Sequence, residues 1–316
     1  MVSLARIVDM GFYIPRTSHT YGDIASLSGL PPEVVRDKLG VVRKPVEMEL
    51  ELEDMACRSS RPLLIDGRAE RTGVVVYSGS DAKGKLVWTL APKLGYMLGL
   101  KRYYGFDVSS QCVGGLVGLH VSSKLVGGSG YVLLSVATKQ SWLVDYSDPS
   151  STFMYDFSDG AMSALIAEDE GPYEVLSSSF LSDGWFGDVV YAGGERSKLV
   201  VHEVEGWRDR MKSESKRNFV YVVEEALRQA GASTSKVGFL GLVHMKRSFH
   251  RELLDSLGVS AERSVYLEEY GHMQGVDPFL ALDIAARQRM IRKGDLVVLA
   301  SAGTGWTWGA SVLEVV

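Results

Sequence analysis

The feature that most constrains the fold of this chain is an internal repeat of strand and helix patterns. The first half is expected to contain a strand, a helix, a strand, a long apolar helix and two strands, at residues 73–78, 86–98, 104–109, 113–126, 131–137 and 162–167. The second half repeats this order at residues 237–243, 249–257, 265–267, 271–291, 295–300 and 310–315. Such alternation predicts mostly parallel sheets with helices on their faces.

Cys112 and His272 occupy equivalent places in this repeat, each between a strand and a long helix. His244 also follows a strand, and ligands of parallel sheets bind beyond the carboxyl ends of the strands. We therefore expect the three side chains at one shared centre. A helix that begins at Cys112 would direct free N–H groups and its positive dipole end at the sulfur, which favours the nucleophilic thiolate. The alternatives are a buried structural cysteine, a helix-capping His272 and a structural His244.

Composition and charge exclude several classes of function. The net charge of −5 argues against non-specific nucleic-acid binding, which needs a basic face. Cys57 and Cys112 form no CxxC pair, and no apolar run reaches the roughly 20 residues of a membrane span. The first residues lack the pattern of a signal peptide, so a cytoplasmic location is expected. Cys112, His244 and His272 could together bind zinc, although their spacing matches no short zinc pattern.

Five motifs occur in a fixed order along the chain, at residues 106–112, 157–161, 182–184, 243–244 and 303–309. They read FDVSSQC, FSDGA, SDG, VH and GTGWTWG. On these motifs the sequence resembles the thiolase superfamily, and most closely its β-ketoacyl synthase III branch of condensing enzymes. The resemblance extends over essentially the whole chain.

The resemblance implies an α/β thiolase fold, in which two similar βαβαβαββ halves form five α-β-α-β-α layers. Residues 1–170 would carry the nucleophile Cys112, and residues 171–316 would carry both histidines. It implies an acyltransferase whose cysteine takes an acyl group from acyl-CoA or an acyl carrier protein and condenses it with a malonyl thioester. No tightly bound cofactor is expected beyond coenzyme A or phosphopantetheine thioesters as substrates, and a homodimer with paired central strands is expected.

The resemblance also implies roles for single residues. The backbone N–H groups of Cys112 and Gly305 would form the oxyanion hole, and neutral His244 and His272 would donate hydrogen bonds to an enolate. For this we expect burial to lower the pKa of both imidazoles. Phosphates of coenzyme A would contact a set of cations comprising Lys38, Lys246, Arg247, Arg208 and Lys212.

Departures from the synthase III pattern leave other functions open. His272 stands where the family has an asparagine, which gives a Cys-His-His triad like that of the elongating synthases. Val34 lies near the place of the tryptophan that stacks on adenine, and Asp81 is the carboxylate nearest to the glutamate position of hydroxymethylglutaryl-CoA synthases. Acyl transfer like that of those synthases, of thiolases or of ester-forming enzymes is one alternative. A non-catalytic partner subunit with the same fold is another.

Overall fold

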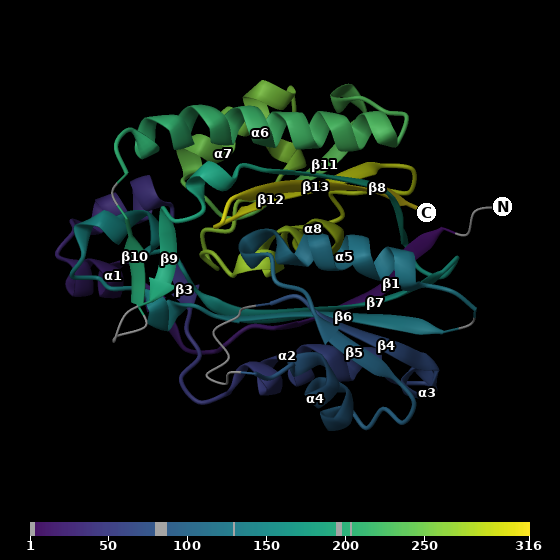
Figure 1. Ribbon diagram of the computed structural model, residues 1–316. Coiled ribbons are helices and arrows are strands. Elements are labelled where there is room, and N and C mark those ends of the chain that lie inside the picture. The colour runs from purple at the N-terminus through teal and green to yellow at the C-terminus, as the bar shows by residue number, and fades with distance from the viewer. Residues whose placement is uncertain (1–3, 80–86, 129, 194–197, 203) are drawn as a thin grey trace.

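The computed structural model describes residues 4–79, 87–128, 130–193, 198–202 and 204–316. Figure 1 shows five layers, in which two sheets enclose a middle layer of helices and each sheet is covered on its outer face by further helices. The α/β thiolase architecture expected from the sequence is therefore confirmed. Asp81 and the start of the helix expected from residue 86 lie outside the described residues.

The sheet of the first half has the strand order β5-β4-β6-β7-β1. β4 pairs in parallel with β5 and β6, whereas β7 pairs antiparallel with β6 and β1. Its strands are β1 (Ala5–Tyr13), β4 (Thr72–Tyr77), β5 (Tyr104–Asp107), β6 (Tyr131–Lys139) and β7 (Asp159–Glu168). β6 and β7 are almost continuously buried, which explains why their apolar runs do not alternate.

The sheet of the second half has the order β11-β12-β13-β8. Its strands are β8 (Tyr173–Ser182), β11 (Val237–Leu242), β12 (Leu296–Gly303) and β13 (Thr307–Val315). β11 and β12 are parallel, and β13 pairs antiparallel with β12 and β8. In the described part of the chain the two sheets join through β1 and β8, where Arg6 pairs with Glu174 and Ile7 with Tyr173.

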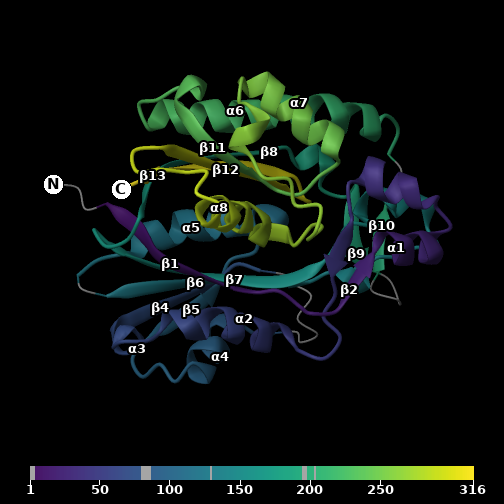
Figure 2. The same cartoon turned by 180° about the vertical axis from the view of Figure 1, so that it is seen from behind.

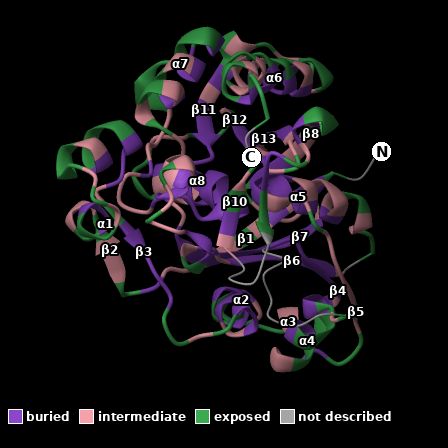
Figure 3. Ribbon diagram, turned by 60° about the vertical axis from the view of Figure 1, so that its left-hand side comes forward, coloured by how far each residue is buried: buried purple, intermediate pink, exposed green. Residues whose placement is uncertain are grey.

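The helices form the other three layers. The middle layer holds α5 (Gly114–Leu125) and α8 (Asp277–Arg287), and Figure 3 shows α8 and the strands mostly buried, while the outer faces of α6 and α7 are exposed. The outer helices are α2 (Leu52–Ser60), α3 (Arg68–Arg71) and α4 (Leu90–Met97) below, and α6 (Trp207–Gln229) and α7 (Arg247–Leu257) above. Separate apolar cores fill the spaces between these layers, and the largest surrounds α5 and α8.

Short elements gather at one side of the layers, as Figure 2 shows from behind. They are β2 (Ser18–Thr20), α1 (Tyr21–Ser28), β3 (Arg43–Pro45), β9 (Val190–Gly193) and β10 (Lys198–Val201). A π-helical turn, Val34–Leu39, lies between α1 and β3 and carries Lys38. These segments belong to no part of the predicted repeat.

One element of the predicted repeat is wrong. Residues 265–267 form no strand, so β5 of the first sheet has no counterpart in the second. Instead, Ser264 just before the segment and Tyr266 within it donate their side-chain hydroxyls to the carbonyls of Leu240 and Met245. Side-chain anchoring replaces strand pairing there.

The division of the chain near residue 170 stays a prediction. A turn between β7 and β8 occupies this place.

The two halves meet closely at a pair of glycines in the middle layer. Gly115 lies in the first turn of α5, and Gly275 lies in the turn that precedes α8. A Cβ atom added to Gly115 would lie 2.2 Å from the carbonyl oxygen of Gly275. Each glycine follows its candidate site residue, Cys112 or His272, by three positions. The absence of side chains at this contact therefore lets the two site residues approach each other.

Replacing Gly115 by alanine should force these two backbones apart. We expect a loss of about 1–3 kcal/mol in the free energy of unfolding, as for other overpacked cores, and a lower midpoint of thermal unfolding by circular dichroism. Gly127→Ala is the matched control, because a Cβ there meets no atom within 4 Å. Equal midpoints for the two variants would contradict the close contact.

Candidate active site

Cys112 lies in a single helical turn, Gln111–Val113, between β5 and α5. It is buried, with 6% of its surface exposed. The preceding residue, Gln111, has a φ of 48°, a left-handed conformation that non-glycine residues rarely adopt. This turn reverses the chain between strand and helix and places the cysteine at the N-terminus of α5, as the sequence predicted.

Strand β12 of the second half holds the backbone of Cys112. Ser301 is buried and donates its hydroxyl to the carbonyl of Cys112 at 2.6 Å. A Cβ atom on Gly303 would lie 2.9 Å from the Cys112 nitrogen, so only glycine fits there. Gly305, the expected second oxyanion donor, has a φ of 94°, and a Cβ on it would meet open space. The glycine packed on Cys112 is thus Gly303; the donor role of Gly305 stays a prediction.

His272 contacts the sulfur directly. Its Nε2 lies 3.1 Å from Sγ of Cys112, and its Nδ1 lies 2.6 Å from Oδ2 of Asp277. Burial by itself lowers the pKa of His272, but the charges of Cys112 and Asp277 and the hydrogen bonds to both outweigh burial and raise the pKa well above its ordinary value. The expectation of a lowered pKa is wrong for His272, because a buried imidazole between two anionic partners is favoured as the cation.

His244 follows β11 and is held by different partners. Its Nδ1 lies 2.9 Å from Oδ2 of Asp156, and its Nε2 lies 3.3 Å from the carbonyl oxygen of Gly40. Its ring packs against that of Tyr266, with centroids 5.2 Å apart. The backbone N–H of His244 donates to Oδ2 of Asp277, the same oxygen that holds His272. The structure therefore brings both histidines to one carboxylate, with His272 nearer to the sulfur.

A short bridge of backbone also fixes His272. Its N–H donates to the carbonyl of Asp156 at 2.8 Å, and its own carbonyl accepts from Ser158 at 2.9 Å and from the amide of Gln140 at 2.7 Å. The ring of Phe157 stands edge-on to the imidazole, with centroids 5.1 Å apart. The motif at residues 157–161 thus acts on the site through its backbone and its aromatic ring.

A buried lysine supports this bridge from behind. Lys44 in β3 is fully buried, and its Nζ donates to the carbonyls of Tyr155 at 2.8 Å and Phe157 at 2.6 Å. Burial lowers the pKa of Lys44 to about 8, and the charges of Asp156 and Asp159 oppose that shift. The sequence analysis missed Lys44 and Asp156, because they lie 111 and 88 positions from the groups that they bind. It also missed Asp277, which lies five positions after His272 and meets its ring only through the turn at Gln274–Val276.

The five cations expected to bind phosphate differ in their exposure and in their partners. Lys38 and Lys246 are exposed, whereas Arg247 pairs with Glu268 and lies 4.3 Å above the ring of Tyr266. The π-helical turn with Lys38 packs beside α7.

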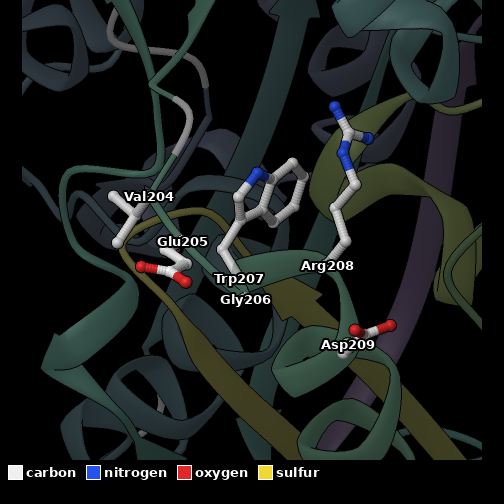
Figure 4. A pocket seen from close by; sticks show the side chains of 6 residues that line it. All are labelled: Val204, Glu205, Gly206, Trp207, Arg208 and Asp209. Atoms are coloured by element: carbon white, nitrogen blue, oxygen red, sulfur yellow. The ribbon is translucent and has the colours of Figure 1, made fainter.

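Arg208 and Lys212 are exposed on α6. Figure 4 shows Arg208 beside Trp207 at a surface hollow of about 360 Å³. Glu205 and Asp209 line the same hollow, and their charges oppose phosphate binding there. Within the described residues, no group of three His, Cys, Asp or Glu side chains is placed to hold a metal ion.

Comparisons with known proteins agree with this geometry. The family model "3-Oxoacyl-[acyl-carrier-protein (ACP)] synthase III" matches residues 106–184, and the model of its C-terminal part matches residues 227–315. Together the two segments make up more than half of the chain. A β-ketoacyl-[acyl-carrier-protein] synthase III of Desulfotalea psychrophila is 28% identical, over 98% of each chain. The chain is a condensing enzyme of the synthase III type.

Other relatives extend the agreement to the whole chain. The synthase III of Roseobacter denitrificans is 27% identical over 99% of this chain and 100% of its own. The crystal structure of the Aquifex aeolicus synthase III superposes with a TM-score of 0.88 at 22% identity, over 98% of this chain and 99% of that one. At this identity, the similarity to the Aquifex aeolicus structure supports the fold. No helix in the described part of this synthase III-type chain has both the length and the apolar character that a membrane crossing needs.

The His272 cation should govern the reactivity of Cys112. Because the pKa of His272 is raised, its ring stays charged through neutral pH and loses its proton only as the pH rises through the raised value. In His272→Asn the sulfur has no cation beside it, so alkylation by iodoacetamide should slow roughly tenfold or more near pH 7 and its pH profile should move upward.

The measurement is alkylation at Cys112 itself, followed by peptide mass spectrometry, since Cys57 is a second thiol. His250→Asn is the control, because burial lowers the pKa of that buried histidine to about 4 and it is neutral at this pH. An unchanged profile in His272→Asn would contradict the assigned pairing.

Proposed function

We propose that Cys112 takes an acyl group from acyl-CoA or an acyl carrier protein and condenses it with a malonyl thioester. The observation that carries this proposal is the 3.1 Å contact between Sγ of Cys112 and Nε2 of His272 at the start of a buried helix. A thiolate held by an adjacent imidazolium is an activated nucleophile. The synthase III likeness supports the same class of reaction.

In the loading step, the thiolate of Cys112 attacks the thioester carbonyl. The N–H groups of Cys112 and Gly305 are the proposed donors to the oxyanion, and one such donor lowers a barrier by about 2.7–4 kcal/mol. As the intermediate collapses, the proton on Nε2 of His272 passes to the departing thiolate. The acyl group is then held on the sulfur, and the carrier leaves as a thiol.

In the second step, loss of carbon dioxide from the malonyl thioester gives an enolate that attacks the acyl carbonyl on Cys112. The new carbon–carbon bond replaces the carbon–sulfur bond, and Cys112 leaves as the thiolate. We assign hydrogen bonds to the enolate oxygen from Nε2 of His272 and Nε2 of His244. After the loading step, Nε2 of His272 has given up its proton and takes up another from solvent. Asp277 favours this protonated ring, which is a strong hydrogen-bond donor. Asp156 binds Nδ1 of His244, and Nε2, which lies 3.3 Å from the Gly40 carbonyl oxygen, would exchange that contact for the enolate oxygen.

The phosphates of the carrier are proposed to contact Lys38, Lys246 and Arg247. Lys246 and Arg247 begin α7 two residues after His244, and the turn with Lys38 lies beside this helix. Arg208 and Lys212 remain candidates for a more distant contact, with less electrostatic support because of Glu205 and Asp209.

The test is incubation with acetyl-CoA, followed by malonyl-CoA. We expect an acetyl adduct by intact mass in the native chain and in Cys57→Ala, none in Cys112→Ala, and then release of labelled carbon dioxide. Failure to form an adduct would sink the enzymatic proposal and favour a partner subunit. An adduct without carbon dioxide would favour another acyl transfer on the same fold.

We also propose a homodimer formed through the edge of the first sheet. β5 ends the strand order, and Tyr104 on it is 55% exposed, whereas β11 at the other end is covered. Within the described residues no strand lies beyond β5, and open strand edges pair readily with another chain.

A charge on this edge should separate the two copies. Tyr104→Lys is expected to convert a dimer into monomers at micromolar concentration, measured by mass photometry or sedimentation. Tyr221→Lys on α6 is the control, since Tyr221 is 50% exposed and lies on another face. A native chain that is monomeric, or a Tyr104→Lys variant that stays dimeric, would contradict the proposed edge.

A further inference from the structure

Asp277 is the least expected charged group of the site. It is the first residue of α8 and is fully buried, yet among the described residues its carboxylate accepts no hydrogen bond from the N-terminal N–H groups of its own helix. Oδ2 accepts from Nδ1 of His272 at 2.6 Å and from the backbone of His244 at 2.9 Å, and Oδ1 accepts from the backbone of Met273 at 2.7 Å. All of these donors belong to the two histidine segments, so helix capping does not explain this carboxylate.

We propose that Asp277 is a positioning residue that makes His272 the proton carrier of Cys112, in a relay of Cys112, His272 and Asp277. The inference rests on the proposed role of Cys112 as nucleophile. It adds a residue that the sequence analysis did not assign and gives the two histidines different tasks.

The hydrogen-bond pattern fixes the proton positions. Two backbone N–H groups, of His244 and Met273, donate to the two oxygens of Asp277, as they do to a carboxylate. A carboxylate that accepts at both oxygens is satisfied at its 2.6 Å contact with His272 when Nδ1 carries the hydrogen. The proton that the ring exchanges is then the one on Nε2, the nitrogen that faces the sulfur. A carboxylate on the far nitrogen that fixes the tautomer and stabilises the imidazolium is the arrangement of a Ser-His-Asp triad.

The other carboxylate–histidine pair shows why Asp277 is distinct. Asp156 holds Nδ1 of His244, but its Oδ1 is buried without a hydrogen-bond partner among the described residues. Nε2 of His244 lies near the Gly40 carbonyl, whereas Nε2 of His272 lies at the sulfur. The groups whose charges act on His272 are Cys112 and Asp277. Loss of the Asp277 charge should therefore affect the cysteine more than loss of the Asp156 charge.

The experiment is a double-mutant cycle on Cys112 alkylation by iodoacetamide, which needs no acyl substrate. In Asp277→Asn the rate near pH 7 should fall roughly tenfold or more and the pH profile should move upward, because the ring loses the partner that holds it protonated on both nitrogens. Asp156→Asn should change the profile less. Asp283→Asn, on α8 but paired with Arg287, should leave the profile as in the native chain. In the His272→Asn background, Asp277→Asn should have no further effect on the rate.

An additive effect of Asp277→Asn in the His272→Asn background would overturn the relay, since it would show that Asp277 acts only through backbone structure. An effect of Asp156→Asn equal to that of Asp277→Asn would overturn it as well. Thermal unfolding identifies any variant that does not fold. In that case the native chain supplies the test through its proton NMR spectrum, where the short Nδ1–H bond predicts a downfield resonance that is absent from His272→Asn. Absence of that resonance from the native spectrum would overturn the relay.

The proposed function fails separately from this inference. If acetyl-CoA leaves no adduct on Cys112 while the alkylation cycle behaves as expected, the relay holds and the acyl-transfer proposal is wrong. If the adduct forms and the cycle is additive, the acyl transfer holds and the relay is wrong.

Discussion

The buried contact between the sulfur of Cys112 and the imidazole of His272 is the interaction on which the rest of the structure depends. The two groups come from equivalent places in the two halves, and each lies just before a helix of the middle layer. Neither charge would be stable alone in this interior, because an isolated buried ion loses several kcal/mol of hydration. In the proposed mechanism the two form a pair that Asp277 completes, and the reactive thiolate then depends on the packing of both halves.

The surrounding fold can be understood as support for that pair. Glycines 115 and 275 let the middle helices touch, and Ser301 and Gly303 of β12 hold the cysteine backbone. On the histidine side, the segment around Phe157 pairs with His272, and Lys44 holds two carbonyls of that segment. A fully buried lysine near the site is costly unless it is well hydrogen-bonded. The two hydrogen bonds of Lys44 offset this cost and hold the segment around Phe157, and through it the histidine segment, rigid.

Much of the fold followed from the sequence, because apolar runs and helix starts are local signals. The repeat predicted β4, β6, β11 and β12 and the places of Cys112 and His244 after strands. The prediction failed at residues 265–267, where distant side-chain hydrogen bonds replace a strand. The pKa of His272 was predicted in the wrong direction, since the carboxylate that raises it contacts the ring only after the turn around Gln274 brings the two together. Asp156 and Lys44 lie 88 and 111 positions from the groups that they bind, and no local pattern indicates such partners.

The protonation state of His272 in the resting protein tests this account most directly. With ¹⁵N-labelled histidine, and with the signal assigned by comparison with His272→Asn, nitrogen NMR at neutral pH reports both ring nitrogens. The account predicts that both carry a proton, as in an imidazolium beside a thiolate. An unprotonated Nε2 at neutral pH would contradict it, because the sulfur would then keep its own proton and the two halves would enclose an ordinary thiol.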